Sequence, residues 1–489
     1  MTENNFKADN KAFAKNQINR EIDTILTKID TILEENDESN RPCKCHSKCK
    51  TICQSNIKDN IIIINTPGNY CLGEDLVFNT PHDPSSTAIL INSPDVNLNL
   101  NQHVINGTKI VRFGIRVLGN NITISNGIIE NFSQTGMFLI AGDNITLTSL
   151  KIINIIGLER LTFITGIFAQ TIRNFTIDNC LIDTITSEFA NNSMDGLRIE
   201  FGSNLIMKDC IIRNCTGGLQ ISGISILRTV GIKMVNITIN SITKFQPFER
   251  IDETKGINLN GCLEFNLSGI NIYGVIGETS RVVGIQITGN GESMPLITAL
   301  SVIENCNVAY ISCPKGDFLT FAMGIRCHQH PRLNVINSNV FNVISKGDGQ
   351  AFGFADSNST IIYNNCIASS ISAIATATGF GFDIYSFFSD QHSLDIIFNA
   401  CIAENCLGNK GIGFDLFRHL NCLYNNCITK SNNYGILNDG PVTNPNDPVS
   451  TVPNDSRNNT IKNIIATNNT ESGILDTTNK NTYISSTIT

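Results

Sequence analysis

Two aspartates near the C-terminal end of the chain hold matching places in neighbouring copies of a short repeated phrase. Asp383 and Asp415 each close the sequence Gly-Phe-Asp. If the two copies form adjacent parallel strands, the carboxyl groups lie roughly 5 Å apart. Carboxyls at about that distance act as acid and nucleophile in retaining glycosidases, and they also bind Ca²⁺. A solvated acidic pair without chemistry is the alternative.

A second group of reactive side chains lies near the N-terminus, where five soft ligands fall within eleven residues: Cys43, Cys45, His46, Cys49 and Cys53. Thiolates and imidazole could hold one tetrahedral Zn²⁺, although the spacing is not that of a standard zinc finger. Disulfides in oxidising surroundings, or no specific role, fit the same residues. Cys327, His328 and His330 form a further possible soft-metal group, for which a solvated loop is the alternative.

The elements that must position these residues come from a repeat, in which the phrase Gly–apolar–x–apolar returns along the chain. Its shortest spacing is 22 residues, and the longer spacings read as the same unit with an inserted loop. Each phrase is followed by two further short runs of alternating apolar residues, which predict strands, and three strands per unit predict one coil of a parallel β-helix. The copies begin at Gly114, Gly136, Gly166, Gly196, Gly218, Gly256, Gly284, Gly324, Gly353, Gly381, Gly413, Gly435 and Gly473.

The third residue of each phrase is predicted to face outward, in a groove between the inserted loops. Aromatic, amide and charged side chains in file along such a groove suit the hydroxyl groups and ring faces of a polysaccharide or other glycan. An ordinary solvated sheet face is the alternative. Read along the chain, the third residues are Arg116, Phe138, Phe168, Arg198, Gln220, Asn258, Gln286, Arg326, Ala355, Asp383 and Asp415.

These coils, together with the segments 66–76 and 96–107, resemble the right-handed parallel β-helix proteins of the pectin-lyase-like class. The resemblance covers residues 61–489. It implies an all-β fold, a right-handed single-stranded parallel β-helix of about thirteen or fourteen coils. It also implies that a polysaccharide lies along the sheet formed by the glycine phrases.

One motif resembles a catalytic element within that class. The sequence Ser193-Met194-Asp195-Gly196 is similar to the Asn-Thr-Asp-Gly element of polygalacturonase-type hydrolases, so Asp195 joins the candidate substrate-binding residues. Those enzymes carry an Asp-Asp pair one coil further on, where this chain has Thr216-Gly217-Gly218. Their Gly-His-Gly and Arg-Ile-Lys motifs are missing as well. The departures argue against their specific inverting mechanism.

Most other cysteines recur at one place in the repeat, just after its second corner. Stacked coils would bring such residues into a ladder of buried thiols, which is a packing role. The asparagines before several of them suit a left-handed corner. The cysteines at this place are Cys180, Cys210, Cys306, Cys366, Cys401 and Cys427.

The first forty residues follow a different pattern. Ile18, Ile22, Ile25, Ile29 and Ile32 are spaced alternately by four and three residues, as in a short heptad seam. The seam predicts an α-helix over residues 1–40, either packed singly on the end of the rod or joined in a homotrimer. We place a Cys-rich linker at 41–56 and the β-helix at 57–489.

Composition narrows the functional classes. The chain has 35 basic and 43 acidic residues, a net charge of −8, which argues against a nucleic-acid or anionic-membrane partner. The apolar runs are too short for a membrane span of about 20 residues, and residues 1–17 lack the apolar core of a signal peptide. The abundance of Asn, Ile and Cys resembles proteins of large DNA viruses, which would make the chain a virion or cytoplasmic protein.

Two functions therefore fit the sequence. The first is a non-catalytic rod, a structural or glycan-binding surface or fibre protein. The second is a polysaccharide lyase or glycosidase that acts in the groove and uses Asp383 and Asp415. The incomplete catalytic motifs favour the first function. Neither requires a cofactor beyond the Ca²⁺ and Zn²⁺ sites considered above.

Overall fold

The fold is known from a computed structural model, in which residues 49–489 form one compact unit and residues 1–48 another. The structure describes residues 49–488 except for 80–85, 159–162, 188, 190–191, 245–252, 279–280, 290–299, 317–319, 331, 348, 358, 383–392, 439–441, 445–446, 453–455 and 477–479. The predicted helix with its isoleucine seam lies outside the described residues, and so do Cys43, Cys45, His46 and Asp383. The part described holds no α-helix, only one 3₁₀ turn, η1 (Gln54–Asn56), and therefore no helix that could span a membrane.

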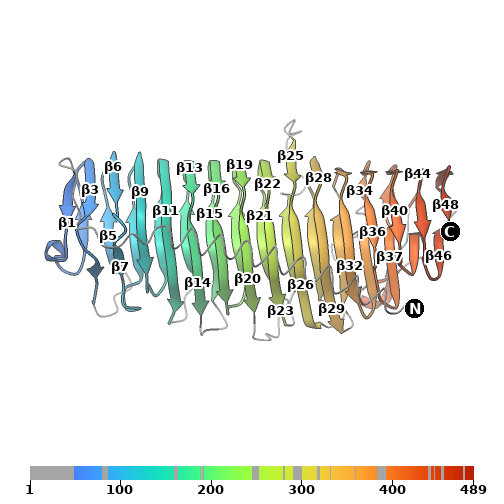
Figure 1. The fold of residues 1–489 in the computed structure, drawn as a ribbon, viewed down its shortest axis with the longest axis horizontal. Helices are drawn as coiled ribbons and strands as arrows, with labels where there is room; N and C mark the ends of the chain where they lie inside the picture. Colours follow the sequence, from blue (N-terminus) through green and yellow to red (C-terminus); the bar gives the residue numbers. More distant parts are fainter. Residues whose placement is uncertain are drawn as a thin grey trace, which may run out of the picture. The chain divides into compact units, whose positions relative to one another are not determined.

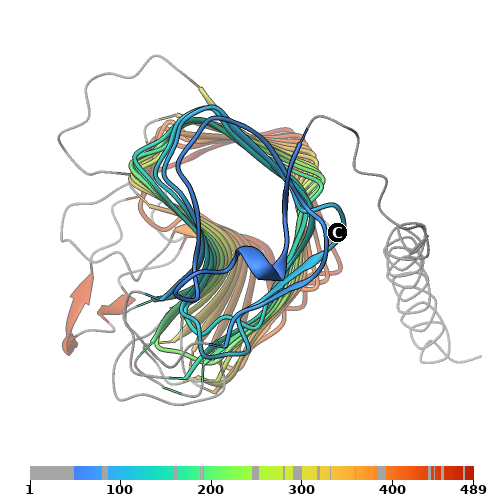
Figure 2. The same ribbon diagram turned by 90° about the vertical axis from the view of Figure 1, so that its left-hand side faces the viewer.

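The unit that begins at Cys49 is a parallel β-solenoid, a stack of coils that each contribute strands to two long sheets (Figure 1). Seen from the end, the coils overlie one another around a common axis (Figure 2). The prediction of an all-β parallel solenoid is therefore confirmed. The sheet with one strand per coil, called the front sheet below, has 15 strands.

The front sheet contains the glycine phrases and runs the length of the rod. All its neighbouring pairs are parallel, as Phe138↔Phe168 and Phe168↔Arg198 illustrate. Its strands are β2 (Ile62–Ile64), β5 (Thr87–Ile91), β8 (Phe113–Val117), β10 (Thr135–Ile140), β12 (Phe163–Gln170), β15 (Ser193–Glu200), β18 (Ile221–Leu227), β21 (Glu253–Asn260), β24 (Arg281–Thr288), β27 (Phe321–His328), β30 (Gln350–Ser357), β33 (Thr376–Phe382), β37 (Lys410–Asp415), β41 (Tyr434–Asn438) and β46 (Ser472–Asp476).

The remaining coil strands form the back sheet, which has 29 strands and takes two from most coils. They are β1 (Lys50–Ile52), β3 (Gly68–Leu72), β4 (Leu76–Val77), β6 (Val96–Asn99), β7 (Val104–Asn106), β9 (Ile122–Glu130), β11 (Asp143–Gly157), β13 (Arg173–Asp178), β14 (Leu181–Ser187), β16 (Ser203–Lys208), β17 (Ile211–Thr216), β19 (Val230–Val235), β20 (Thr238–Lys244), β22 (Leu263–Ser268), β23 (Asn271–Gly277), β25 (Ser301–Glu304), β26 (Asn307–Gly316), β28 (Leu333–Ile336), β29 (Asn339–Gly347), β31 (Ile361–Asn364), β32 (Ile367–Ala373), β35 (Ile397–Asn399), β36 (Ile402–Glu404), β39 (Leu423–Asn425), β40 (Ile428–Lys430), β44 (Thr460–Lys462), β45 (Ile465–Thr467), β47 (Thr482–Ile484) and β48 (Thr487–Ile488). Two small sheets pair β34 (Ser393–Leu394) with β38 (His419–Leu420), and β42 (Val442–Asn444) with β43 (Asp447–Val452).

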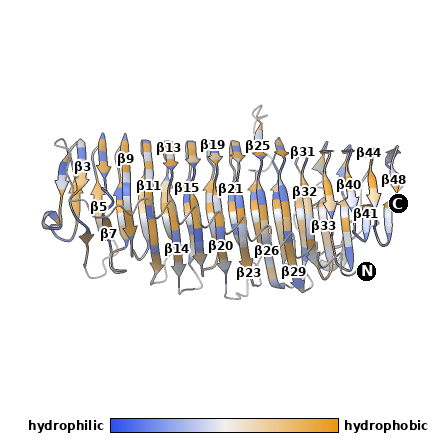
Figure 3. Ribbon diagram, viewed as in Figure 1, coloured by the Kyte–Doolittle hydropathy of each residue, from blue (hydrophilic) through white to orange (hydrophobic). Residues whose placement is uncertain are grey.

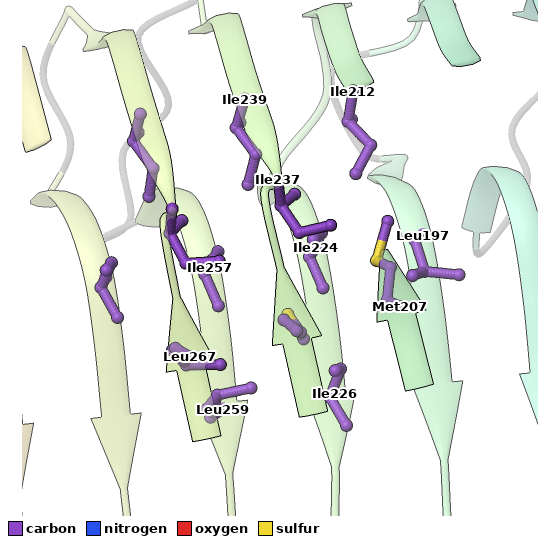
Figure 4. Close-up of a cluster of buried hydrophobic side chains, with 14 of the residues drawn as sticks. Leu197, Met207, Ile212, Ile224, Ile226, Ile237, Ile239, Ile257, Leu259 and Leu267 are labelled. Atoms are coloured by element: carbon purple, nitrogen blue, oxygen red, sulfur yellow. The ribbon is translucent and has the colours of Figure 1, made fainter. Parts of the chain in front are cut away.

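The interior of the coils is a continuous apolar core. Apolar and polar residues alternate along the strands, so that one side of each strand faces inward (Figure 3). Ile224 and Ile257 of the front sheet share this interior with Ile239 and Leu267 of the back sheet (Figure 4). All four are fully buried. Because every coil buries its side chains against the next one, the core extends along the whole rod.

The predicted thiol ladder is present in this core. The amide after each cysteine binds the carbonyl of the equivalent residue one coil earlier, so that Ile402 N–H donates to Cys366 O and Ile428 N–H to Cys401 O, both at 2.9 Å. All six cysteines of the ladder are buried free thiols. Their predicted place, buried in the core of stacked coils, is confirmed.

Asparagine corners join the strands of the back sheet. The predicted left-handed conformation is confirmed at Asn126, Asn179 and Asn305, where φ is 58°, 50° and 53°. Exposed amide groups at equivalent corners bind one another from coil to coil: Asn174 Nδ2 donates to Asn144 Oδ1 at 2.9 Å, and Asn204 Nδ2 to Asn174 Oδ1 at 2.9 Å. At these corners, therefore, the amide groups of successive coils satisfy one another.

A column of glycines runs along the front sheet, one on each coil from β8 to β46. A β-carbon added to Gly136 would lie 2.4 Å from Ile152 in the core and 2.8 Å from the carbonyl oxygen of Gly166 on the next coil. Met137, the next residue, also faces the core. Two successive inward positions break the strand alternation, so each strand bends at its glycine. The column is Gly114, Gly136, Gly166, Gly196, Gly223, Gly256, Gly284, Gly324, Gly353, Gly379, Gly413, Gly435 and Gly473.

This column corrects two of the predicted phrases. Gly223 takes the place expected for Gly218, and Gly379 takes the place expected for Gly381. In both stretches two glycines fit the phrase, because Gly-Leu-Gln-Ile is followed after one residue, Ser222, by Gly-Ile-Ser-Ile, and Gly379-Phe-Gly381-Phe repeats itself. The contact with the glycine of the neighbouring coil decides which one occupies the bend.

Candidate functional site

The outward side chains of the front sheet form two columns that flank the glycines. We call the file two residues after the glycine the outer column. Its members are Arg116, Phe138, Phe168, Arg198, Ser225, Asn258, Gln286, Arg326, Ala355, Gly381 and Asp415. Because of the bend, the residue just before each glycine also faces outward, and we call this file the second column: Thr135, Thr165, Asp195, Ser222, Lys255, Val283, Met323, Phe352 and Thr378.

Seven of the predicted substrate-binding residues therefore do stand in file, and two predicted residues do not. Gln220 lies exposed in the turn before β18, and Ser225 occupies its expected place. Asp383 lies outside the described residues, two positions beyond the outer-column residue Gly381. Asp195 belongs to the second column. The role of these residues in binding a ligand remains a prediction.

The aspartate pair expected at the C-terminal end is corrected by this register. Phe380 pairs with Phe414, so Asp415 stands opposite Gly381 and not opposite Asp383. The Asp415 carboxylate accepts a hydrogen bond from the amide of Phe417 at 3.0 Å. The described residue matched to Asp415 on the neighbouring coil is therefore Gly381, and the pairing of Asp415 with Asp383, which lies outside the described residues, remains a prediction.

Aromatic rings line the outer column at its N-terminal end. Phe138 and Phe168 stack with their centroids 5.2 Å apart and their planes 14° from parallel. The guanidinium of Arg116 lies 5.5 Å from the Phe138 ring and 5.4 Å from Phe113. All four side chains are half-buried. A flat apolar surface beside a cation suits the ring face of a sugar.

The charged centre of the front sheet begins on β15. One guanidinium joins two carboxylates there: Arg198 Nη1 lies 3.0 Å from Asp195 Oδ2, and Arg198 Nη2 lies 2.7 Å from Glu200 Oε1. The same guanidinium stacks on Phe163 of the preceding coil, with its carbon 4.2 Å from the ring centroid. Arg198 and its two partners are thereby fixed in one orientation on the outer face.

The Asp195 side chain is almost completely buried, with 4% of the residue exposed. Burial raises the pKa of this carboxyl above its ordinary value, and the charges of Arg198 and Lys255, with a hydrogen bond from Ser222, offset only part of the rise. Ser222 is the second-column neighbour of Asp195, and Lys255 is the neighbour of Ser222. A carboxyl of this kind on an outward position can serve as a proton donor.

Two coils further on, Glu253 has the opposite environment. Burial pushes the pKa of its carboxyl upward, but the nearby charges of Lys255, Arg326 and Arg281 outweigh burial and hold the pKa below its ordinary value. Lys255 forms an ion pair with Glu253. Arg281 and Arg326 both lie over the ring of Phe321, at 5.3 and 5.4 Å from its centroid. Glu253 is therefore an ionised carboxylate among cations.

Between these groups two buried amide oxygens lack partners. Asn258 Oδ1 and Gln286 Oε1 accept no hydrogen bond, and the two residues are direct neighbours in the outer column. Their amide nitrogens are already used, Asn258 Nδ2 by Ser225 Oγ and Gln286 Nε2 by Thr288 Oγ1, each at 3.4 Å. A buried acceptor without a donor costs about 1–3 kcal/mol, so a donor from a bound molecule would be favourable here.

The predicted metal group near the N-terminus is corrected at Cys49. This residue forms a disulfide with Cys71, 22 residues later, with 5.9 Å between their α-carbons. Cys49 is therefore not a zinc ligand, and Cys53 is a free thiol. Among the residues from Cys49 onward that the structure describes, no three His, Cys, Asp or Glu side chains are grouped closely enough to hold a metal ion.

The group around Cys327 is likewise not a solvated loop. Cys327 faces the core, and His330 is buried beside Phe265, whose ring centroid lies 5.3 Å from that of the imidazole. Neither ring nitrogen of His330 has a hydrogen-bond partner. Burial lowers the pKa of His330 to about 4. His330 is thus a neutral imidazole inside the scaffold.

Sequence reasoning missed five residues of the charged centre: Glu200, Ser222, Glu253, Lys255 and Arg281. It counted only the third residue of each phrase as outward, as a straight strand would require. The available signal was charge. Acidic or basic residues stand within six positions of the glycine on β15, β21 and β24, where an interior strand would not carry them.

A surface pocket of about 420 Å³ lies away from these columns, at the corner between the front and back sheets. Asp143, Arg173 and Phe201 contribute to its lining. Its two charged groups bind each other, with Arg173 Nη2 at 2.7 Å from Asp143 Oδ2. The front sheet is therefore the stronger candidate site.

Known proteins resemble this chain only distantly. No family model and no curated protein matches the sequence. Among solved structures, the Agl-KA catalytic domain is 14% identical with a TM-score of 0.37, over 80% of this chain and 60% of its own, so this chain spans less than two thirds of it. The A-module of the mannuronan C-5 epimerase AlgE6 from Azotobacter vinelandii is 11% identical with a TM-score of 0.38, over 83% of this chain and 91% of its own.

The pectate lyase Pel9A is 11% identical with a TM-score of 0.22, over 72% of this chain and 66% of its own. Likenesses this distant carry no argument. The chain is a parallel β-solenoid, and what its front sheet does has to be argued from the side chains of that sheet.

Proposed function

We propose that this chain is a carbohydrate-active enzyme that acts on a polysaccharide bound along the outer face of the front sheet, with Asp195 as the general acid. This function is the enzymatic one of the two that fit the sequence, and not the non-catalytic rod. It moves the chemistry from Asp383 and Asp415 to the coils around β15 and β21. The observation that carries it is the pair Asp195 and Glu253, whose environments shift their carboxyl pKa values in opposite directions.

Opposite shifts of two carboxyls on one face are what acid–base catalysis requires. Asp195 would hold the proton and give it to the glycosidic oxygen as the bond breaks. Glu253 would stay ionised and take a proton from the attacking water. The two residues lie two coils apart and two residues out of register, so their α-carbons are separated by roughly 12 Å. A separation that leaves room for a water between the carboxyls is typical of inverting glycosidases.

The remaining groups of the site support binding and positioning. The stacked rings of Phe138 and Phe168 offer a surface for sugar ring faces. Arg198, held by Asp195 and Glu200, presents a fixed guanidinium beside the proton donor. Asn258 and Gln286 offer acceptors for sugar hydroxyl groups. Aromatic, cationic and acceptor groups in one file match a long, hydroxyl-rich ligand better than a compact one.

The test measures turnover on a panel of neutral and acidic polysaccharides, by new reducing ends and by the absorbance of unsaturated sugars. Reducing ends without unsaturation are expected from hydrolysis. Asp195→Asn should lower kcat/KM by about 10²- to 10⁴-fold, the usual contribution of a general acid. Glu253→Gln should give a comparable loss.

The matched control is Asp209→Asn, an exposed carboxylate of the back sheet that accepts a hydrogen bond from Asn236 at 3.0 Å. This variant should keep full activity. Wild-type activity in Asp195→Asn would refute the assignment of the acid. Binding of a glycan by a chain that turns over no member of the panel would instead support the non-catalytic rod, and unsaturated products would indicate a lyase.

A further inference from the structure

The surface pocket at the corner between the front and back sheets, called the corner pocket below, is built from two columns of stacked residues. The first column follows the front strands β10, β12 and β15 and consists of Ala141, Thr171 and Phe201. The second column belongs to the back strands β11, β13 and β16 and consists of Asp143, Arg173 and Ser203. The pocket therefore spans three coils, or roughly 10 Å, and its volume of about 420 Å³ is within the range of small-molecule sites.

Phe201 forms the wall at one end of the corner pocket. Its side chain is 48% exposed and so adds little to the core. Its φ is 57°, in the left-handed region that bulky residues rarely adopt. Arg228, the equivalent residue one coil further on, lies over the ring, with its guanidinium carbon 5.6 Å from the centroid. The two preceding coils carry only Thr171 and Ala141 at this place, and their side chains are too short to cover the ring.

The second column supplies fixed polar groups. Arg173 Nε and Nη2 donate to the two carboxylate oxygens of Asp143, each at 2.7 Å, and Asn120 Oδ1 accepts a hydrogen bond from the Asp143 amide at 2.9 Å. The hydrogen bond from Arg173 lowers the pKa of Asp143, which is therefore ionised at neutral pH. Both side chains stay accessible, at 34% for Asp143 and 69% for Arg173. Carboxylate lone pairs and guanidinium hydrogens thus remain for a ligand.

We propose that the corner pocket binds a neutral sugar residue, with its apolar ring face against Phe201 and its hydroxyl groups on Asp143 and Arg173. An aromatic ring offers a flat apolar surface to a sugar ring. A hydroxyl group can donate to the carboxylate and accept from the guanidinium, whereas an anionic group could only accept and would be repelled by Asp143. The pocket lies outside the two outward columns of the front sheet. It would hold a glycan without reacting with it, so this inference does not depend on the function proposed above.

The experiment titrates the full-length Asp195→Asn variant calorimetrically with neutral and acidic oligosaccharides, so that the proposed general acid does not consume the probe. Phe201→Ala in this background should weaken the binding of a neutral oligosaccharide at one site per chain by at least about tenfold, which corresponds to 1.4 kcal/mol. A second variant, Thr171→Arg, fills the pocket with the residue type that already stands on the other side of Phe201 as Arg228. It should abolish binding at the same site.

The matched control is Tyr310→Ala. Tyr310 is likewise an aromatic residue in the left-handed region, with φ of 56° and 37% exposure. It lies on the back strand β26, away from the pocket, and its ring contacts Phe341 with 6.0 Å between the centroids. Tyr310→Ala should bind every oligosaccharide as its parent does. A loss in this control equal to that in Phe201→Ala would refute the inference.

The remaining outcomes separate this inference from the proposed function. Unchanged affinity in either folded pocket variant would refute the inference, and turnover of polysaccharide by the wild-type chain would leave the proposed function standing. Weakened binding in Phe201→Ala, in a chain that turns over no polysaccharide, would support the inference and refute the proposed function. Tighter binding of acidic than of neutral oligosaccharides at this site would refute the assignment of a neutral sugar.

Discussion

The back and front of the rod treat the same kinds of polar side chain in different ways. On the back sheet, Asn307 donates to Asn271 at 3.1 Å and accepts from Asn339 at 3.1 Å, so one amide serves the next from coil to coil. On the front sheet, Asn258 and Gln286 are direct neighbours, yet the oxygen of each lacks a donor. Both regions are parallel sheets with the same spacing between strands.

The difference lies in repetition. Where consecutive coils carry the same residue at one place, each polar group finds its partner in the coil above or below. The outer column instead changes from arginine to serine, to amides and back to arginine, so the coils cannot satisfy one another completely. Polar groups that the scaffold leaves unpaired in a buried position are the ones that a bound molecule can satisfy.

Activity should depend on pH through the front sheet alone, and this is the largest effect that we expect. Turnover requires Glu253 ionised and Asp195 protonated, so kcat/KM should fall about tenfold per pH unit below the lowered pKa of Glu253 and above the raised pKa of Asp195. A pH–rate profile measures both limbs. Glu253→Gln should remove the acidic limb, and a variant that keeps it would assign that limb to another group.

His330 tests the comparison between the two sheets, because its ring is buried and unpaired but lies outside the two outward columns. Its pKa of about 4 lies below the ordinary value of 6.5, so the unfolded chain binds a proton in this range and the folded chain does not. The stability that the neutral ring preserves is complete above about pH 6.5 and is lost as the pH falls towards 4, by about 3 kcal/mol in total.

His330→Phe should abolish that part of the pH dependence. The measurement is the free energy of unfolding by urea at pH 7 and pH 4.5, compared between variant and wild type. Such a result would show that the buried, unpaired imidazole lowers the free energy of unfolding at acidic pH, although no ligand binds it. Identical pH dependence in the two chains would mean that the His330 ring has a proton-accepting partner in solution.

The smallest effects come from a matched pair of leucine substitutions, one on each sheet. Asn307→Leu breaks the hydrogen bonds with Asn271 and Asn339 and should lower the free energy of unfolding by about 1–2 kcal/mol, with no change in glycan turnover. Asn258→Leu removes an unpaired oxygen, so stability should stay level or rise while the affinity for the glycan falls. Urea titrations and KM values distinguish the two. Equal losses of stability would show that the two sheets do not differ in this respect.

Much of the scaffold could be predicted from the sequence, because each coil of a solenoid repeats the same residue pattern and the spacing of the repeats gives the length of a coil. The glycine phrases located the front sheet, and the recurrent cysteines located a column of the core. The period also held a signal that was overlooked: Cys49 and Cys71 are 22 residues apart, which is the length of the shortest coil, and the structure joins them. A period predicts which residues are neighbours along the stack.

The site was harder to predict, because it depends on a departure from regular geometry. The bend at Gly196 turns Asp195 outward beside Arg198, where strict alternation would separate the two faces. In two stretches two glycines fit the phrase, and the sequence analysis chose the wrong one, so two predicted members of the outer column were misplaced. One of them was Asp383, to which the sequence analysis had assigned catalysis. Which glycine fits the bend depends on contact with the next coil, and a phrase of four residues does not contain that information.

The column of glycines limits how the sequence of such a protein can evolve. Each glycine from Gly114 to Gly435 leaves room for the backbone of the following turn, so a side chain at any one of these positions would clash with the core and with the next coil. The bend of the front sheet is thus a shared property that no individual turn can alter alone. The residues beside it are under no such restraint. A lineage of these proteins could change the outward side chains by small substitutions while inheriting the same bend unchanged.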